Sequence, residues 1–332
     1  MRLLSVVREH YYGNRSVTEP MVLYFTEPLR AMGHKVETFD HYAAGIRFGA
    51  LHGAELLGKQ IQEGGYDLVF YQTSGSEPIE ISLLAPLAAK QLIVAWNSDD
   101  DWQWEPCTRH LAHNFSFMIT TYPDIYEANR SRYPNLLLSQ WGCYPGYADF
   151  SRTKDIEFSF VGQVYGARNQ ACRFLSRKAG LRYFGPGARW AAAGLPHVRG
   201  IFRFPVLAGR PVSFAQVHQI WNRSRISYTP MGSGPDCKML QVKSRTFDMG
   251  LSGTLMLCEL SPNLERYYDP GHEFVAFENL EDCAEKARFY LRNETERALI
   301  ARRYRDRTLA EHLWEHRFAQ LFREIGAASR NR

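Results

Sequence analysis

The chain has 332 residues, of which 45% are hydrophobic and 23% are charged, and its formal net charge is +5. A chain of this length and composition can bury the cores of two domains of ordinary size. The positive charge is too small and too evenly spread to favour a nucleic-acid partner. It suits an anionic ligand such as a nucleotide, or loose attachment to an anionic membrane face.

Targeting and metal-binding patterns are missing from the sequence. No stretch approaches the roughly 20 apolar residues that a membrane span needs, and the first residues, MRLLSVVREHYY, become charged too early for a signal peptide. The six cysteines are scattered without a C-x-x-C pair, which argues against a zinc site and against a disulfide framework. We therefore expect a cytoplasmic protein without a bound metal.

The first half of the chain alternates short apolar runs with segments of helical length. Strands are predicted at residues 2–9, 35–41, 66–72, 91–97, 115–122 and 135–144, and helices at 54–65 and 81–90. Buried strands that alternate with helices are typical of a parallel sheet covered on both faces. Residues 144–155, which contain glycine and proline, have the composition of a linker.

The alternation begins again after this linker. Strands are predicted at 156–163, 181–187, 225–230, 254–259 and 273–277, helices at 169–180, 214–224 and 243–253, and a helical end from 278 onward. We expect an α/β protein with two Rossmann-like, doubly wound domains facing a cleft, followed by C-terminal helices. The predicted domains are residues 1–150 and 151–332, and the last helix could also pack back on the first domain.

The segment KSRTFDMGLSG, residues 243–253, places Lys243 and Arg245 at the start of a predicted helix, just ahead of a buried strand. A helix N-terminus attracts anions, and an ammonium and a guanidinium both suit phosphate. Asp248 could accept hydrogen bonds from the hydroxyls of a ribose. An amphipathic helix with a solvated Lys and Arg would show the same pattern, so the segment alone leaves both interpretations open.

From about residue 230 to residue 318 the sequence resembles the C-terminal domain of GT-B glycosyltransferases of group 1, in particular their CgeB-like subgroup. The matching residues keep their type, order and spacing through several elements. They are Lys243, Arg245, Phe247, Asp248, Gly253, Thr254, Pro262, Pro270, Gly271, Glu273, Leu280, Glu281, the segment YLRN at 290–293, Ile300, Ala301 and His312. The resemblance implies an acceptor domain at residues 1–150 and a nucleotide-sugar donor domain at 151–332.

The implied activity is transfer of a sugar from a nucleotide-diphosphate sugar to a hydroxyl acceptor, with retention at the anomeric carbon and without a metal or other cofactor. A UDP-sugar is favoured, and GDP- and dTDP-sugars are alternatives. In such enzymes an acidic residue at the place of Asp248 contacts the ribose. The family usually has glutamate there, and a second glutamate where this chain has Leu240. Lys243 and Arg245 would hold the diphosphate, on which negative charge grows as the sugar leaves.

Two loops of the second half follow strands of the predicted sheet, where this fold binds its donor. The residues predicted to bind the donor nucleotide are Gly162, Gln163, Val164, Tyr165 and Arg168 in and after the first loop, and Met231, Gly232 and Ser233 in the second. The second loop is expected to be flexible enough to close over the sugar and the diphosphate. Either loop could also be an ordinary connection.

The first half supplies candidates for catalysis and acceptor binding at its strand ends. His10 is of a residue type that can take a proton from an acceptor hydroxyl, and Asp100 lies among three adjacent carboxylates that could hold a base or cap a helix. Acceptor or sugar contacts are predicted for Glu9, Tyr12, Asn14, Thr73, Ser74 and Asp99. A base is required if the anomeric configuration is inverted, and His10 is dispensable if it is retained.

Two other functions stay open. A sugar-nucleotide epimerase would share the paired-domain architecture and would need no acceptor. A non-catalytic nucleotide-sugar-binding protein of the same fold is kept open by Leu240, which stands where the family has a glutamate. The expected partners are a nucleotide-sugar donor and a hydroxyl acceptor, and the sequence does not indicate an oligomeric state.

Overall fold

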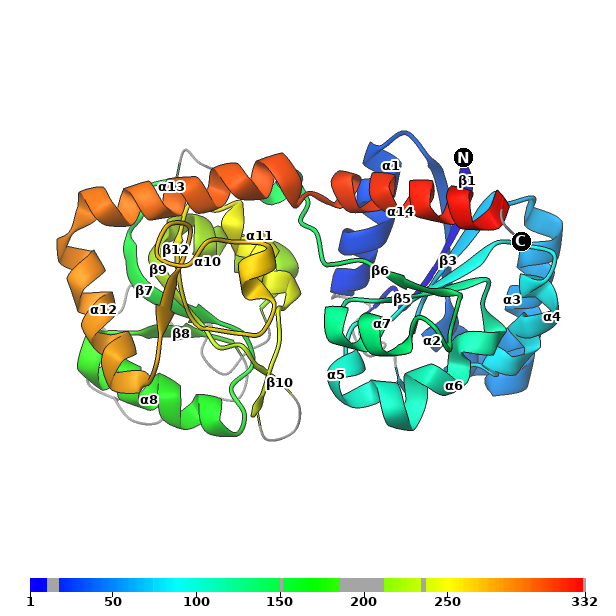
Figure 1. Ribbon diagram of the computed structural model, residues 1–332, viewed down its shortest axis with the longest axis horizontal. Coiled ribbons are helices and arrows are strands. Elements are labelled where there is room, and N and C mark those ends of the chain that lie inside the picture. Colours follow the sequence, from blue (N-terminus) through cyan, green and yellow to red (C-terminus); the bar gives the residue numbers. More distant parts are fainter. Residues whose placement is uncertain (11–17, 74, 150–151, 186–211, 234–236, 331–332) are drawn as a thin grey trace. The chain divides into compact units, whose positions relative to one another are not determined.

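The computed structural model describes residues 1–10, 18–73, 75–149, 152–185, 212–233 and 237–330 (Figure 1). The chain forms two compact units, of which the first comprises Met1–Tyr144 and Trp314–Arg332 and the second Pro145–Leu313. The predicted boundary at residue 150 and the predicted site residues Tyr12, Asn14 and Ser74 lie outside the described residues.

The first unit is built on a six-stranded sheet whose paired strands are all parallel, in the order β2-β1-β3-β4-β5-β6. The strands are β1 Arg2–Val7, β2 Lys35–Asp40, β3 Leu68–Gln72, β4 Ile93–Trp96, β5 Phe117–Thr120 and β6 Leu136–Leu138. Because β1 lies between β2 and β3, the chain winds to one side of β1 and then to the other. Ligands in such sheets bind where the winding reverses, at the carboxyl ends of the strands.

Short helices and turns of helix connect these strands. The α-helices are α1 Glu27–Ala31, α2 His41–Phe48, α3 Ala50–Gly64, α4 Ala85–Ala88, α5 Asp100–Gln103, α6 Arg109–Leu111, α7 Pro123–Asn129 and α14 Trp314–Arg330. The π and 3-10 turns are η2 Val22–Thr26, η3 Ile81–Leu84, η4 Trp104–Thr108 and η5 Ala112–Asn114. Apolar side chains of α3, η3 and η5 form one buried cluster with side chains from one face of the sheet.

Helix α14, the last element of the chain, packs with this first unit. Its Phe318 ring lies 5.8 Å from Phe70 of β3, and its Trp314 ring lies 5.2 Å from Phe25 and 5.5 Å from Trp96 of β4. The chain therefore leaves the first unit after Tyr144 and returns to it after Leu313.

The second unit is built on a five-stranded sheet with the order β13-β12-β9-β7-β8, again with parallel pairing. The strands are β7 Ile156–Val161, β8 Arg182–Phe184, β9 Ser224–Thr229, β12 Leu255–Glu259 and β13 Val275–Phe277. The winding reverses at β7, which lies between β8 and β9. The loops that follow β7 and β9 are therefore neighbours at the carboxyl edge of the sheet.

The helices of the second unit cover both faces of its sheet. They are α8 Ala167–Ala179, α10 Phe214–Arg223, α11 Ser244–Gly250, α12 Leu280–Arg292 and α13 Glu294–Glu311, with 3-10 turns η6 Pro145–Tyr147 and η7 Leu264–Arg266. Helices α8 and α12 pack against each other on one face, and α10 and α11 are neighbours on the other (Figure 1). A short antiparallel hairpin, β10 Gly232–Ser233 and β11 Met239–Leu240, follows β9.

The predicted fold class is confirmed, since two parallel-sheet, Rossmann-like domains carry the helices. Every strand and helix predicted before residue 278 is present in its place. Helices α1, α2, α5, α6 and α7 and the hairpin were not predicted. In the part of the chain that the structure describes, no helix combines the length and the apolar character needed to cross a membrane.

Candidate functional site

The donor residues predicted in the second unit meet where the winding of its sheet reverses. Gly162 directly follows β7 and has φ +148, a backbone conformation that favours glycine. A Cβ atom built on Gly162 would lie 3.4 Å from Nη1 of Arg245. The guanidinium of Arg245 therefore lies against the backbone of the loop after β7, although the two residues are far apart in the sequence.

A second meeting point is the carbonyl oxygen of Gly232, in the loop after β9. Nη2 of Arg168 donates a hydrogen bond to it at 2.6 Å, and Nζ of Lys243 donates to the same oxygen. Two cations thus converge on one backbone oxygen. With Arg245 against the neighbouring loop, three cations from two segments, the starts of α8 and α11, lie around the ends of β7 and β9.

Arg168 is held on several sides. It is 5% exposed, its Nη1 donates to the carbonyl of Gln163 at 3.5 Å, and its guanidinium carbon lies 4.4 Å from the ring centroid of Tyr165. A cation over an aromatic face is attracted by the negative charge of that face. Arg168 therefore joins the loop after β7 to the loop after β9.

The segment after β9, expected as a flexible loop, is a hairpin with an anchored base. The amide of Met231 donates to Oε2 of Glu259 at 2.6 Å, and the amide of Gln241 donates to the carbonyl of Met231 at 3.2 Å. The side-chain amide of Gln241 also hydrogen-bonds to Oγ of Ser233. Both Met231 and Ser233 are buried, so the base of the hairpin is part of the domain core.

Lys243 carries the strongest electrostatic perturbation of this cluster. Burial, followed by repulsion from Arg245 and Arg168, lowers the pKa of Lys243 to about 6, and Cys237 and Glu259 oppose this shift. An ammonium that is crowded by two other cations gains more from an anionic partner than a solvated one does. The site therefore favours a ligand with concentrated negative charge.

Helix α11 begins as the sequence indicated, but Asp248 is not at its exposed entrance. Lys243 occupies the N-cap position and Arg245 lies in the first turn, both partly buried. Asp248 lies in the following turn and is 1% exposed. Its carboxylate is enclosed by protein here, so its predicted contact with a ribose would require side-chain or helix movement.

Two further residues of this cluster, Glu259 and Tyr183, were not predicted, and Leu240, which the sequence singled out as the place of a family glutamate, lies in the hairpin. Glu259 ends β12 at the same edge of the sheet and holds Met231, and the hydroxyl of Tyr183 donates to the carbonyl of Gly162 at 2.9 Å. Leu240 pairs directly with Gly232 in the hairpin and is 39% exposed. Glu259 could have been found from the sequence, because it ends a predicted strand just as Gly162 follows one.

The predicted acceptor residues of the first unit are engaged with their own strands. Glu9 follows β1 and accepts a hydrogen bond from the hydroxyl of Thr38 in β2. Thr73 follows β3, is buried, and donates to the carbonyl of Trp96 at 3.0 Å. Both side chains lie at the carboxyl edge, as expected, and both help to join neighbouring strand ends.

The candidate bases of the first unit differ in accessibility. His10 is partly buried and pairs with Thr18 through an isolated antiparallel bridge. Asp99 precedes α5 and is partly exposed, whereas Asp100 is fully buried. Asp99 occupies the N-cap position of α5, but its side chain makes no capping hydrogen bond to the helix. A general base must reach the proton it removes, which an enclosed Asp100 does not do in this conformation.

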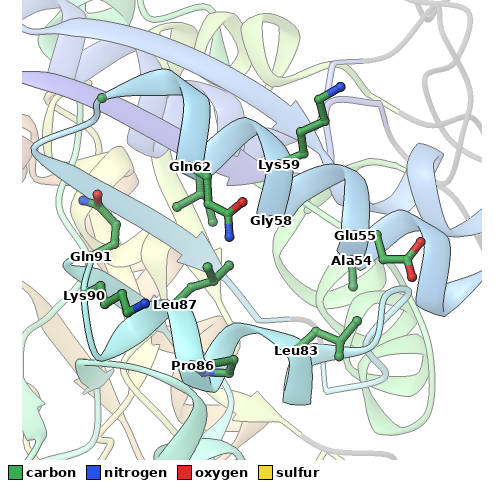
Figure 2. A pocket seen from close by; sticks show the side chains of 12 residues that line it. Ala54, Glu55, Gly58, Lys59, Gln62, Leu83, Pro86, Leu87, Lys90 and Gln91 are labelled. Carbon is green, nitrogen blue, oxygen red and sulfur yellow. The ribbon is translucent and has the colours of Figure 1, made fainter.

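A groove of about 720 Å³ lies elsewhere in the first unit, between α3 and α4 (Figure 2). Gln62 of α3 and Leu87 of α4 point into it, and Lys59 and Lys90 lie at its rim. None of the predicted site residues that the structure describes lines this groove. Among the described residues, no group of three or more His, Cys, Asp or Glu side chains is placed to hold a metal ion.

Comparison with known proteins points to one class of enzyme. Residues 163–323 match a family model described as glycosyl transferase-like, which covers the loop after β7, the hairpin and helix α11. No curated protein sequence matches the chain.

Solved structures resemble the chain over both units. Sucrose-phosphate synthase from Thermosynechococcus elongatus has a TM-score of 0.63 at 12% identity, covering 99% of this chain and 100% of that one. HepE from Anabaena, in complex with UDP and glucose, has a TM-score of 0.62 at 11% identity, covering 98% and 100%. An alpha-glucosyltransferase in complex with UDP and a 13-mer DNA has a TM-score of 0.64 at 10% identity, covering 98% and 100%. The chain thus has the GT-B fold, and the family match supports a glycosyltransferase.

Proposed function

We propose that this protein transfers a sugar from a nucleotide-diphosphate sugar to a hydroxyl acceptor, with retention at the anomeric carbon and without a metal. The observation that carries the proposal is the convergence of Lys243, Arg245 and Arg168 at the ends of β7 and β9. This edge of a doubly wound sheet is where such folds bind their ligands. Concentrated positive charge at that edge suits a diphosphate.

The three cations also fit the chemistry of sugar transfer, in which the diphosphate is the leaving group. When the bond between the sugar and the diphosphate breaks, negative charge grows on the diphosphate oxygens. Lys243 and Arg245, held in place before the reaction, would stabilise that charge without a large rearrangement. The guanidinium adds a planar pair of donors that matches two phosphate oxygens, and the ammonium adds a compact charge.

A UDP-sugar is the proposed donor, with GDP- and dTDP-sugars as alternatives. Two of the structurally similar proteins, HepE and the alpha-glucosyltransferase, are described as complexes with UDP. The first unit is proposed to bind the acceptor hydroxyl, with His10 and Asp99 as the candidates at its carboxyl edge. Retention, which rests on the family resemblance, would make a strong base at His10 unnecessary.

Removal of either cation should weaken nucleotide binding. We expect Lys243→Ala and Arg245→Ala each to reduce the affinity for UDP by roughly 1–3 kcal/mol, the range for charge-assisted contacts. Isothermal titration calorimetry measures the change directly. Arg177→Ala, which removes an exposed cation from α8, serves as the control and should bind UDP as the unchanged protein does.

Four outcomes would count against the proposal or a part of it. Unchanged UDP affinity in both variants would remove the diphosphate from this cluster. Interconversion of the sugar during incubation with the donor alone would indicate an epimerase, and binding without transfer to any acceptor would indicate a non-catalytic protein. Transfer activity should persist in EDTA, and its loss there, with recovery on adding a divalent cation, would contradict metal independence.

A further inference from the structure

Arg168 differs from the two other cations in what its side chain already contacts. Its two terminal nitrogens donate to two backbone carbonyls, one in each loop, while its face lies over Tyr165. It is also the most enclosed of the three, at 5% exposure, whereas Lys243 and Arg245 are only partly buried. Both of its terminal nitrogens are therefore directed at the protein backbone, while its buried Nε has no hydrogen-bond partner among the described residues.

Lys243 donates to one of these two carbonyls but has further N–H groups that could donate to a ligand. Its Nζ donates to the carbonyl of Gly232, and an ammonium has three N–H donors. A planar guanidinium can hold two carbonyls at a fixed distance from each other, which an ammonium on a flexible chain cannot do. The two cations on Gly232 are thus suited to different tasks.

The geometry points to Arg168 as a positioning residue, which fixes the loop after β7 and the base of the hairpin relative to each other and leaves the anion to Lys243 and Arg245. The inference rests on the proposed function for the identity of the ligand. The contacts of Arg168 with Gln163, Tyr165 and Gly232 exist without a ligand. We call these three contacts the brace, and they can be tested in the ligand-free protein.

The charge of Arg168 has a second effect, on Lys243. The groups that face the Lys243 ammonium are Arg245 from α11, Arg168 from α8, Cys237 from the hairpin and Glu259 from β12. Arg168 lowers the pKa of Lys243, so a neutral residue at position 168 should raise that pKa, and a lysine there should leave it nearly unchanged. A residue that only held the two loops together, without a charge near Lys243, would not shift the pKa of Lys243.

The brace is tested by amide hydrogen exchange in the ligand-free protein. We expect faster exchange in peptides covering residues 229–233 and 237–242 for Arg168→Lys and Arg168→Gln, because neither side chain can hold both carbonyls as a guanidinium does. Arg177→Gln, on the exposed side of α8, should exchange as the unchanged protein does. Thermal unfolding confirms that each variant is folded, and the conservative Arg168→Lys provides the test if the glutamine variant is not.

The effect on Lys243 is tested by the pH dependence of UDP-glucose affinity, since its doubly esterified diphosphate does not titrate near neutrality. In the unchanged protein the affinity should fall as pH rises above about 6, where free Lys243 loses its proton. Arg168→Gln should bind at least several-fold more weakly and begin this fall at higher pH. Arg168→Lys should also bind more weakly, but with the fall at the same pH.

Two results would overturn the inference. Unchanged exchange in both peptide regions, combined with a loss of affinity in both variants, would make Arg168 a direct ligand of the anion. Unchanged exchange together with unchanged affinity would show that Arg168 does not position the loops. Failure of the unchanged protein to bind UDP-glucose would refute the proposed ligand, whereas the exchange result would still decide whether Arg168 braces the loops.

Discussion

The carboxyl group of Asp100 is fully buried at the start of α5, and burial raises its pKa to about 6. The hydroxyls of Thr120 and Thr108 oppose this shift, while the neighbouring Asp99 and Asp101 add to it. The folded protein therefore holds the Asp100 proton more tightly than the unfolded chain does. The contribution of this carboxyl to stability is fully present below its unfolded pKa near 4 and is lost as pH rises through about 6, where the buried group ionises.

Replacement of Asp100 by asparagine should therefore stabilise the protein at high pH. We expect Asp100→Asn to raise the free energy of unfolding by about 3 kcal/mol at pH 8, since the pKa rises from 3.8 to about 6 and each pKa unit corresponds to about 1.4 kcal/mol. The gain should disappear near pH 4, where the native carboxyl is already protonated. Urea unfolding at the two pH values measures both, and Asp306→Asn, at an exposed position, should show no such dependence.

The same variant separates a catalytic role from a structural one. Because Asp100 is enclosed by protein, we expect Asp100→Asn to retain transfer activity. Loss of activity in a variant whose stability and UDP affinity are intact would return Asp100 to the catalytic residues.

At the scale of elements, the hairpin after β9 depends on contacts across the domain. Its strands have two residues each, too few to show a period of alternation in the sequence. What holds its base are Glu259 and Arg168, which lie 28 and 64 residues from their partners in the hairpin. A sequence pattern reports local periodicity, so it could indicate a loop here and not an anchored pair of strands.

Gly232 gives a direct test of the hairpin. A Cβ atom at this position would lie 2.1 Å from the carbonyl oxygen of Cys237, on the opposite side of the hairpin, so the backbone would have to move. We expect Gly232→Ala to weaken UDP binding at least tenfold, because the carbonyl that receives Arg168 and Lys243 would be displaced. Calorimetry measures the loss.

The control for this substitution is Gly326→Ala in α14, where nothing lies within 4 Å of the added carbon. It should leave UDP affinity unchanged. If Gly232→Ala bound UDP as tightly as the unchanged protein, the position of the hairpin base would not matter for the nucleotide.

At the scale of the whole molecule, the chain closes its first unit with its last helix. Trp314 of α14 is 1% exposed and contacts Phe25 and Trp96, so this helix completes the aromatic core over one face of the sheet. The first unit is consequently discontinuous in sequence, and its stability depends on residues that follow the second unit along the chain.

Truncation of this aromatic anchor should destabilise the first unit. We expect Trp314→Ala to lower its free energy of unfolding by about 3–5 kcal/mol, the usual cost of removing a buried large aromatic side chain. Hydrogen exchange during urea unfolding follows the two units separately, and the second should change little. Trp102→Ala, at a tryptophan that is 44% exposed, is the control. Equal effects of the two substitutions would contradict the importance of α14.

The sequence by itself determined the order of strands and helices, the fold class and the placing of Lys243 and Arg245 at the start of α11. These features follow from local periodicity and from residue types that are close together along the chain. Helices α1, α2, α5, α6 and α7 have three to eight residues each, and such short segments carry little periodic pattern.

Only the tertiary structure decided which predicted side chains share a site and which are enclosed. The carbonyl of Gly232 receives Arg168 and Lys243 because the sheet order brings the ends of β7 and β9 together. Asp100 and Asp248 have the same carboxylate group as any exposed aspartate, but both are buried in the folded protein. Burial and long-range contact depend on how the whole chain packs, and no local pattern contains that information.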